Sequence, residues 1–130
     1  MLIKPPIDVF ILTKPKGDDW PFVSSAVQTL NEIFLLEALK GEINIITDDR
    51  KLNTNSIIFS IGGDGTMLQA MRLAASKRAT AYGINLGNVG FLTDYTYSVA
   101  HTEKFIELIV DLLDEVRKTW YDTEINHRDL

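Results

Sequence analysis

Three glycines within four positions, Gly62, Gly63 and Gly65, follow an apolar segment over residues 56–61. Because glycine has no side chain, such a turn between a strand and a helix lets backbone N–H groups come close to a phosphate. Asp64 stands among these glycines. A carboxylate repels a polyphosphate, so this position is costly unless Asp64 accepts a proton or holds a metal ion. The conflict makes Asp64 the first candidate for chemistry.

Thr66 closes this motif, and we expect its hydroxyl to cap the helix that follows. A capped helix start presents free N–H groups and a positive dipole end, worth about 0.3–1 kcal/mol to an anion at the surface. The alternative is a plain tight turn, because Asp-Gly is a common turn dipeptide. A tight turn accounts for Gly65 but leaves Gly62 and Gly63 unexplained.

A second glycine-bearing segment, residues 86–94, contains Phe91 between glycines at positions 87 and 90. An aromatic side chain there could stack on a nucleotide base or fill the core, and the pattern leaves both open. Asp94 could cap or turn the chain. The spacing of Met67 and Met71 predicts core residues, and we expect the two histidines to be solvated.

The expected elements alternate between strands and helices. β-rich runs predict strands over residues 7–12, 43–46, 56–61 and 80–85, and helical periodicity predicts helices between Asp19 and Gly41, over 67–78 and over 101–118. This alternation is typical of a three-layer α/β/α, Rossmann-like domain with a mainly parallel sheet. Both glycine loops would then lie at one edge of the sheet, beyond the carboxyl ends of the strands. The 67–78 helix should be buried, and residues 120–130 look like the polar start of a further segment.

Composition narrows the functions. The 130 residues suit one domain, and the net charge of −5 argues against nucleic acid or an anionic membrane as a partner. The sequence contains no cysteine, which excludes disulfides and thiolate metal sites and fits a reducing cytoplasm. Its first residues do not resemble a signal peptide, and its apolar stretches are shorter than the roughly 20 residues of a membrane span. We therefore expect a cytoplasmic protein that binds small molecules.

The two loops together resemble the motifs of the NAD kinases. The first motif alone is shared with diacylglycerol and sphingosine kinases and, in close variants, with phosphofructokinases. The second, residues 83–94, reads Gly-Ile-Asn-Leu-Gly-Asn-Val-Gly-Phe-Leu-Thr-Asp. It is similar to the NAD kinase pattern of Asn-x-Gly before Gly-Phe-Leu-Thr-Asp, with Val89 where leucine is usual. The spacing between the loops also resembles that family, and the likeness covers nearly the whole chain.

The resemblance implies transfer of the γ-phosphoryl group of ATP, with Mg²⁺, to NAD to make NADP. It makes Asp64 the catalytic base for the 2′-hydroxyl of the adenosine ribose. It also implies that Gln69 contacts the dinucleotide and that Phe91 lies against the adenine. The expected nucleotide-binding residues are Gly62, Gly63, Asp64, Gly65, Thr66, Gln69, Asn85, Phe91 and Thr93. No residue is assigned as a dedicated metal ligand.

The resemblance further implies that residues 1–130 form the N-terminal nucleotide-binding domain. The β-rich C-terminal domain of that family, with the Asn-Glu/Asp pair that holds the nicotinamide-side ribose, is not among these residues. NAD kinases also draw residues from a neighbouring subunit, so a homo-oligomer, a second domain or a second chain would complete the site. One alternative is a non-catalytic nucleotide-binding or regulatory remnant. A lipid kinase of the diacylglycerol kinase type is disfavoured by the second loop and the acidic charge.

Overall fold

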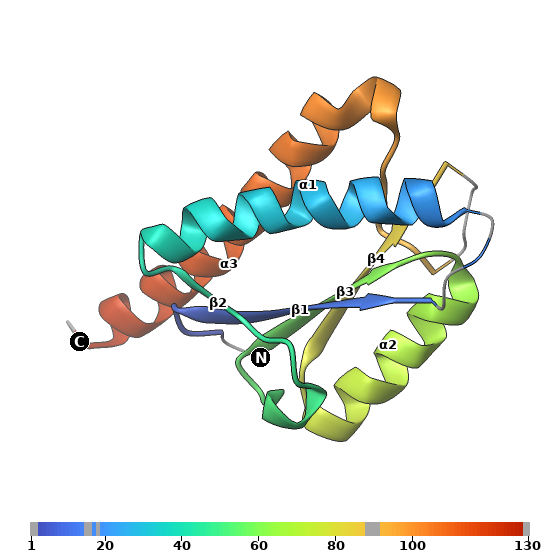
Figure 1. Ribbon diagram of the computed structural model, residues 1–130. Helices are drawn as coiled ribbons and strands as arrows, with labels where there is room; N and C mark the ends of the chain where they lie inside the picture. Colours follow the sequence, from blue (N-terminus) through green and yellow to red (C-terminus); the bar gives the residue numbers. More distant parts are fainter. Residues whose placement is uncertain (1–2, 15–16, 18, 88–91, 129–130) are drawn as a thin grey trace.

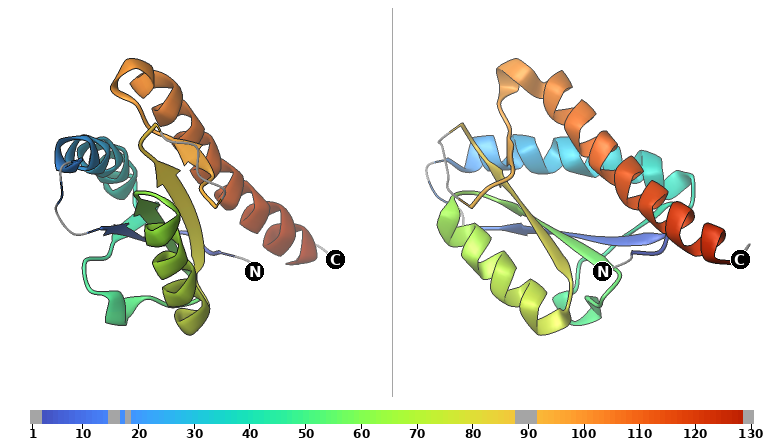
Figure 2. Two further views of the ribbon diagram at one scale, coloured as in Figure 1. Left: turned by 90° about the vertical axis from the view of Figure 1, so that its right-hand side faces the viewer. Right: turned by 180° about the vertical axis from the view of Figure 1, so that it is seen from behind.

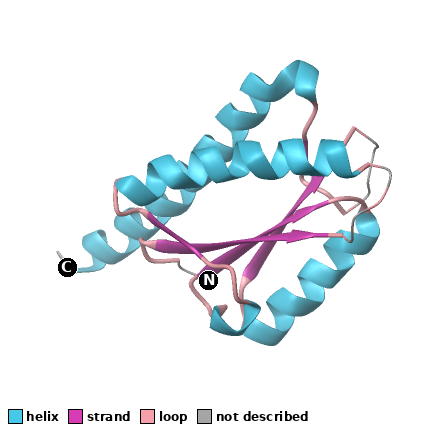
Figure 3. Cartoon of the chain, viewed as in Figure 1, coloured by secondary structure: helices cyan, strands magenta, loops and turns pink. Residues whose placement is uncertain are grey.

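The computed structural model describes residues 3–14, 17, 19–87 and 92–128, with side chains to residue 123. Figure 1 shows the elements along the chain, and Figure 3 separates helices from strands. Two short 3₁₀ helices, η1 (Asp49–Lys51) and η2 (Val99–His101), accompany the main elements. In order, these are β1 (Ile7–Thr13), α1 (Trp20–Leu39), β2 (Ile43–Ile45), β3 (Ser56–Ile61), α2 (Asp64–Lys77), β4 (Thr80–Asn85), β5 (Tyr95–Thr96) and α3 (Thr102–Arg128).

The five strands form one parallel sheet in the order β2-β1-β3-β4-β5. Helices α1 and α3 cover one face of the sheet and α2 covers the other, as the end-on view in Figure 2 shows. The predicted three-layer α/β/α fold with a parallel sheet is confirmed. The strand order reverses between β1 and β3, and open sheets of this kind bind ligands beyond the carboxyl ends of the strands at such a reversal.

Strand β3 is the centre of the core because all six of its residues are buried. Its residues alternate between the two faces, so Ile57, Phe59 and Ile61 pack under α1 and α3 while Ile58 packs under α2. The Phe59 ring lies 5.3 Å from the Phe34 ring of α1. Burying each such side chain contributes about 1.5–3 kcal/mol, so the strand that leads into the first glycine loop is firmly fixed.

Helix α1 begins and ends as its sequence indicates. Asp19 precedes the helix and a proline occupies its first turn, although the Asp19 side chain makes no capping hydrogen bond and pairs with Lys14. Gly41, with a φ of 75°, follows the last turn. The face turned to the sheet buries Val23, Ala26, Leu30, Ile33 and Phe34.

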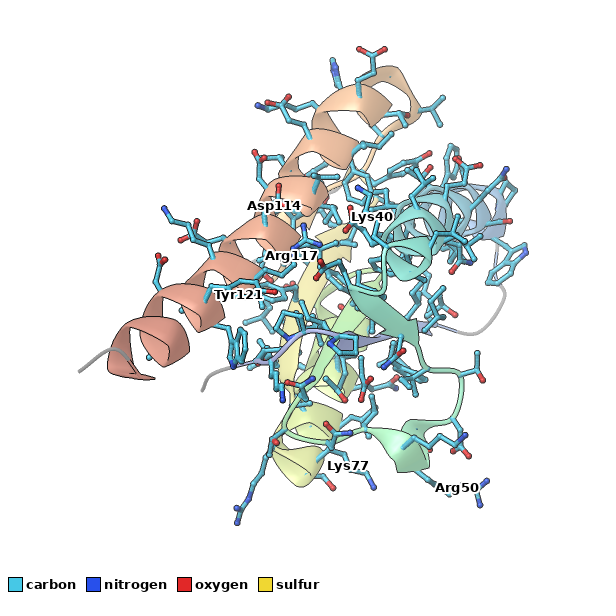
Figure 4. All side chains as sticks on the ribbon, turned by 90° about the vertical axis from the view of Figure 1, so that its left-hand side faces the viewer. Lys40, Arg50, Lys77, Asp114, Arg117 and Tyr121 are labelled. Carbon is cyan, nitrogen blue, oxygen red and sulfur yellow. The ribbon has the colours of Figure 1, made fainter. Side chains whose placement is uncertain are left out.

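A buried ion pair joins α1 to α3. Arg117 Nη1 lies 2.5 Å from Glu37 Oε2, and Arg117 also pairs with Asp114 on its own helix. The Glu37 residue is only 6% exposed, and Lys40 Nζ lies 3.6 Å from its other carboxylate oxygen. Figure 4 shows Arg117 reaching from α3 toward the end of α1 that carries Lys40. This cluster fixes the second half of α3 against the sheet.

Two predictions about helices are wrong. Helix α2 is buried on one face alone, so Met67 is in the core as predicted, but Met71 and Leu68 are about half exposed. The reason is that, among the described residues, α2 is the only α-helix packed on this face of the sheet, so its outer face remains in solvent. The last helix continues through Arg128, so the polar segment after residue 118 extends α3. Among the described residues, no helix is both long and apolar enough to cross a membrane.

Candidate active site

The two glycine loops meet at the carboxyl edge of the sheet, near the start of α2 in Figure 1. Gly62 N donates to Ile84 O at 3.0 Å, which joins the end of β3 to the end of β4. Leu92 N, in the second loop, donates to Asp64 Oδ1 at 3.1 Å. The predicted carboxylate therefore stands at the junction of the two loops.

In the first loop, Gly62 has a backbone conformation that disfavours other residues, with a φ of 153°. A Cβ atom there would lie 2.6 Å from Thr66 Oγ1. Thr66 is buried inside the first turn of α2, and the residue that precedes the helix is Gly63, which offers no side-chain cap. The expected Thr66 cap is wrong because α2 begins two residues earlier, at Asp64.

Gly63 and Gly65 have open space where a side chain would be, since a Cβ at either position meets no atom of the described residues within 4 Å. The described part of the fold therefore gives no steric reason for glycine at these positions. Gly65 lies inside α2, where glycine is less favourable than alanine by about 0.5–1 kcal/mol. The first N–H groups of an α-helix have no carbonyl partner within the helix. A bare backbone with such donors suits the close approach of an anion.

Asp64 is the first residue of α2 and is partly exposed. Its carboxylate lies at the positive end of the helix dipole. The Leu92 N–H adds a hydrogen bond to that charge from outside the helix. Asp64 is thus an oriented proton acceptor at the mouth of the two loops.

In the second loop, the buried Asn85 holds both ends of the segment. Its Nδ2 donates to Thr93 Oγ1 at 2.9 Å, and its Oδ1 accepts from Gly87 N at 3.2 Å. Thr93 lies against Gly83, where a Cβ would be 3.0 Å from Thr93 Cα. Asn85 and Thr93, both predicted for nucleotide binding, are therefore bonded to one another beside Asp64.

Two predicted residues are not placed with this group. Gln69 is exposed on α2, and five residues along an α-helix turn it about 140° away from Asp64. Phe91 lies outside the described residues. The predicted nucleotide contacts of both remain predictions.

Leu92 and Asp94 were not among the predicted site residues. Leu92 acts through its main-chain N–H, which leaves no trace in sequence. Asp94 Oδ2 accepts from Gly83 N at 2.8 Å, while Asp94 N donates to Gly83 O at 2.8 Å. The sequence shows only that Asp94 ends a glycine-bearing loop. That position fits a turn residue as well as it fits this pair of hydrogen bonds to Gly83.

Asp94 also influences two neighbouring tyrosines. Burial raises the pKa of Tyr82, and the charge of Asp94 raises it further. Burial likewise raises the pKa of Tyr95, with smaller contributions from Tyr82 and Asp94. The centroids of the Tyr82 and Tyr95 rings lie 6.3 Å apart. Because both pKa values are raised, this edge of the sheet favours the neutral form of the two tyrosines.

Comparison with known proteins decides the family. The family model described as the ATP-NAD kinase N-terminal domain matches residues 26–115, which is more than half of the chain. The chain belongs to the NAD kinase family. The match includes the first glycine loop and the second, with Asp64, Leu92 and Asp94.

Several curated NAD kinases are similar to this family member. The NAD kinase of Geobacter sulfurreducens is 37% identical over 67 residues, which cover 52% of this chain and 23% of the relative. That of Azoarcus sp. is 40% identical over 65 residues, 50% of this chain and 22% of the relative. That of Helicobacter acinonychis is 29% identical over 93 residues, 67% of this chain and 32% of the relative. The matched part thus spans a third or less of each relative.

The donor set of this NAD kinase domain fits magnesium held mainly by a nucleotide. Within the described residues, no three His, Asp or Glu side chains gather as a metal cage. Mg²⁺ commonly binds through one or two carboxylates, several waters and substrate phosphates. Asp64 could supply one such carboxylate beside phosphates that lie on the first loop.

Proposed function

We propose that this chain is the N-terminal half of an NAD kinase, which transfers the γ-phosphoryl group of ATP to the 2′-hydroxyl of the adenosine ribose of NAD. One observation carries the proposal: Asp64 lies between the two glycine loops and accepts a hydrogen bond from Leu92 N at 3.1 Å. The family membership supports the same reaction. A partly exposed, oriented carboxylate at a phosphate-binding loop is the arrangement that hydroxyl phosphorylation needs.

In the proposed reaction, Asp64 takes the proton of the 2′-hydroxyl as that oxygen bonds to the γ-phosphorus. The bond between the γ-phosphorus and the bridging oxygen of ATP breaks, and ADP leaves with the electron pair. The backbone of Gly63 and Gly65 receives the phosphates, with the positive end of α2 behind them. When bound, Mg²⁺ would neutralise charge on the phosphate oxygens. Phosphate oxygens of the nucleotide and water would hold it.

The remaining contacts are also part of the proposal. Asn85, Thr93, Gln69 and Phe91 would contact the dinucleotide. The nicotinamide-side ribose would be held by residues outside this chain, from a second domain, a second chain or another copy in a homo-oligomer. The partners are nucleotides rather than nucleic acid or membrane, and the expected location is the cytoplasm.

The test uses the protein in its full encoded length, incubated with ATP, Mg²⁺ and NAD, with NADP measured directly. Asp64→Asn keeps the shape but removes the proton acceptor, so turnover should fall by about 10²-fold or more while nucleotide affinity holds or improves. Ser76→Ala, an exposed change near the far end of the same helix, serves as the folding control. NAD binding without any NADP would indicate the non-catalytic remnant instead. Phosphorylation of diacylglycerol in place of NAD would indicate the lipid kinase.

A further inference from the structure

Three consecutive residues of the second loop are each attached to a different partner. Leu92 donates its N–H to Asp64, Thr93 accepts from Asn85, and Asp94 pairs with Gly83. The first attachment reaches the proposed base, and the other two bind the same short segment to β4. Whatever holds Thr93 and Asp94 therefore also sets the position of the Leu92 N–H.

The Asp94 attachment is the strongest of these because it has two points. Its carboxylate accepts from Gly83 N and its own N–H donates to Gly83 O, both at 2.8 Å. A hydrogen bond to a charged acceptor is stronger than one between neutral groups. The partner is part of a fixed strand, since β4 pairs with β3 over five residues.

The sheet alone does not supply this attachment. Strand β5 has two residues, paired with Ile84 and Asn85, and the ladder stops before Gly83. The Asp94 carboxylate occupies the place where a backbone carbonyl of a longer edge strand would accept from Gly83 N. A longer β5 would satisfy that N–H without a side chain, but it would carry the chain away from Asp64.

We infer that Asp94 is a positioning residue that acts through Leu92. Its two hydrogen bonds to Gly83 hold the Leu92 N–H against Asp64 and so fix the orientation of the Asp64 carboxylate. The catalytic meaning of this orientation rests on the proposed function. Asp94 itself needs no contact with substrate. It acts on Asp64 indirectly, through the main-chain N–H of Leu92.

Amide hydrogen exchange of the ¹⁵N-labelled chain tests whether the Asp94–Gly83 contact positions Leu92, and it needs no nucleotide. Asp94→Ala should speed exchange at Leu92 about tenfold or more, relative to amides of β3. Asp94→Asn keeps an acceptor oxygen for Gly83 N, so its exchange rate at Leu92 should lie between those of the unmodified chain and Asp94→Ala. This variant takes the place of Asp94→Ala if the alanine variant does not fold. Asn55→Ala is the matched control, because Asn55 ties main-chain groups of Lys4 and Pro6 near the amino end of β3. It should leave Leu92 exchange unchanged.

A double-mutant cycle separates positioning from plain stability. In an Asp64→Ala background the Leu92 N–H has already lost its acceptor, so adding Asp94→Ala should change its exchange by less than about twofold. Unchanged Leu92 exchange in Asp94→Ala, or the same acceleration with and without Asp64, would overturn the inference.

Turnover of the protein in its full encoded length gives the catalytic readout. Asp94→Ala should lower kcat for NADP formation by about tenfold or more with little change in KM, and Asp94→Asn should restore part of it. A loss that appears in KM alone would refute a role through the base. If the unmodified protein forms no NADP, the proposed function fails, while the Leu92 exchange still decides whether Asp94 positions Asp64.

Discussion

Replacing Gly65 with alanine should stabilise the protein and weaken its binding of nucleotides. Gly65 is the second residue of α2, and a Cβ at this position meets no atom within 4 Å among the residues that the structure describes. Alanine in a helix is more favourable than glycine by about 0.5–1 kcal/mol. For a domain of this size that gain raises Tm by roughly 2–5 °C. The fold alone would therefore prefer alanine.

Nucleotide binding should change in the opposite direction. The open space beside Gly65 is where a phosphate would approach the first-turn N–H groups. A methyl group that intrudes on a close contact costs about 1–3 kcal/mol, so affinity for ATP or NAD should fall about 5- to 150-fold. Thermal unfolding and an NMR titration with each nucleotide, on the same labelled preparation, measure both effects.

Ser76→Ala is the matched control. Ser76 is exposed near the other end of α2, eleven residues from Gly65, and alanine should stabilise the helix there by a similar few tenths of a kcal/mol. Its nucleotide affinity should remain that of the unmodified chain. If Gly65→Ala binds nucleotides as well as Ser76→Ala does, the phosphate-binding role of the first loop is wrong. If Gly65→Ala lowers Tm, the inference that a side chain has room at position 65 is wrong.

Three further predictions concern the rest of the chain. Arg117→Met should lower the free energy of unfolding by about 2–4 kcal/mol because it removes the nearer and more buried of the two cations of Glu37 and leaves only the exposed Lys40, whereas the double change Glu37→Met/Arg117→Met should recover most of that loss; equal losses would refute the pairing. Because burial raises the pKa of Tyr82 above 10, its contribution to stability is complete below pH 10 and is lost as the pH rises through the folded value. Denaturant unfolding followed upward from about pH 10 should show this decline, and Tyr82→Phe should flatten it. The isolated polypeptide 1–130 should form little NADP, because a half-site forfeits positioning worth roughly 7–11 kcal/mol; turnover near 1 per second, about that of ordinary kinases, would contradict this.

The order of elements and the strands of the sheet could be predicted because their signals are local. Strands β3 and β4 have the predicted limits, since each is a β-rich run closed by turn residues. The parallel sheet then follows from the alternation of strands and helices. The common edge of the two glycine loops follows from the sheet, where Gly62 N donates to Ile84 O and joins the ends of the strands that lead into the loops.

The rest of the site depends on contacts that sequence patterns do not encode. Strand β5 has two residues, too few for any alternation to appear. The start of α2 could not be fixed, because Asp-Gly-Thr fits either a capping threonine or a first helical turn. The exposure of Met71 depends on how many helices share one face of the sheet, which helical spacing does not report. The bond from Leu92 to Asp64 joins a main-chain group to a residue 28 positions away.

The structure also accounts for a carboxylate inside a phosphate-binding turn. At an effective dielectric of about 20, a carboxylate about 5 Å from one phosphate charge is repelled by roughly 3 kcal/mol. The Leu92 N–H donates to the Asp64 carboxylate at 3.1 Å, and the carboxylate lies at the start of α2. In the proposed complex these two groups would offset part of that repulsion. In the proposed reaction, the proton that Asp64 takes from the substrate hydroxyl would remove this repulsion as the phosphoryl group is transferred. The proposal therefore gives the second loop a role at the first: its Leu92 N–H holds the carboxylate that would face the phosphates, and this contact forms where both loops end at one edge of the sheet.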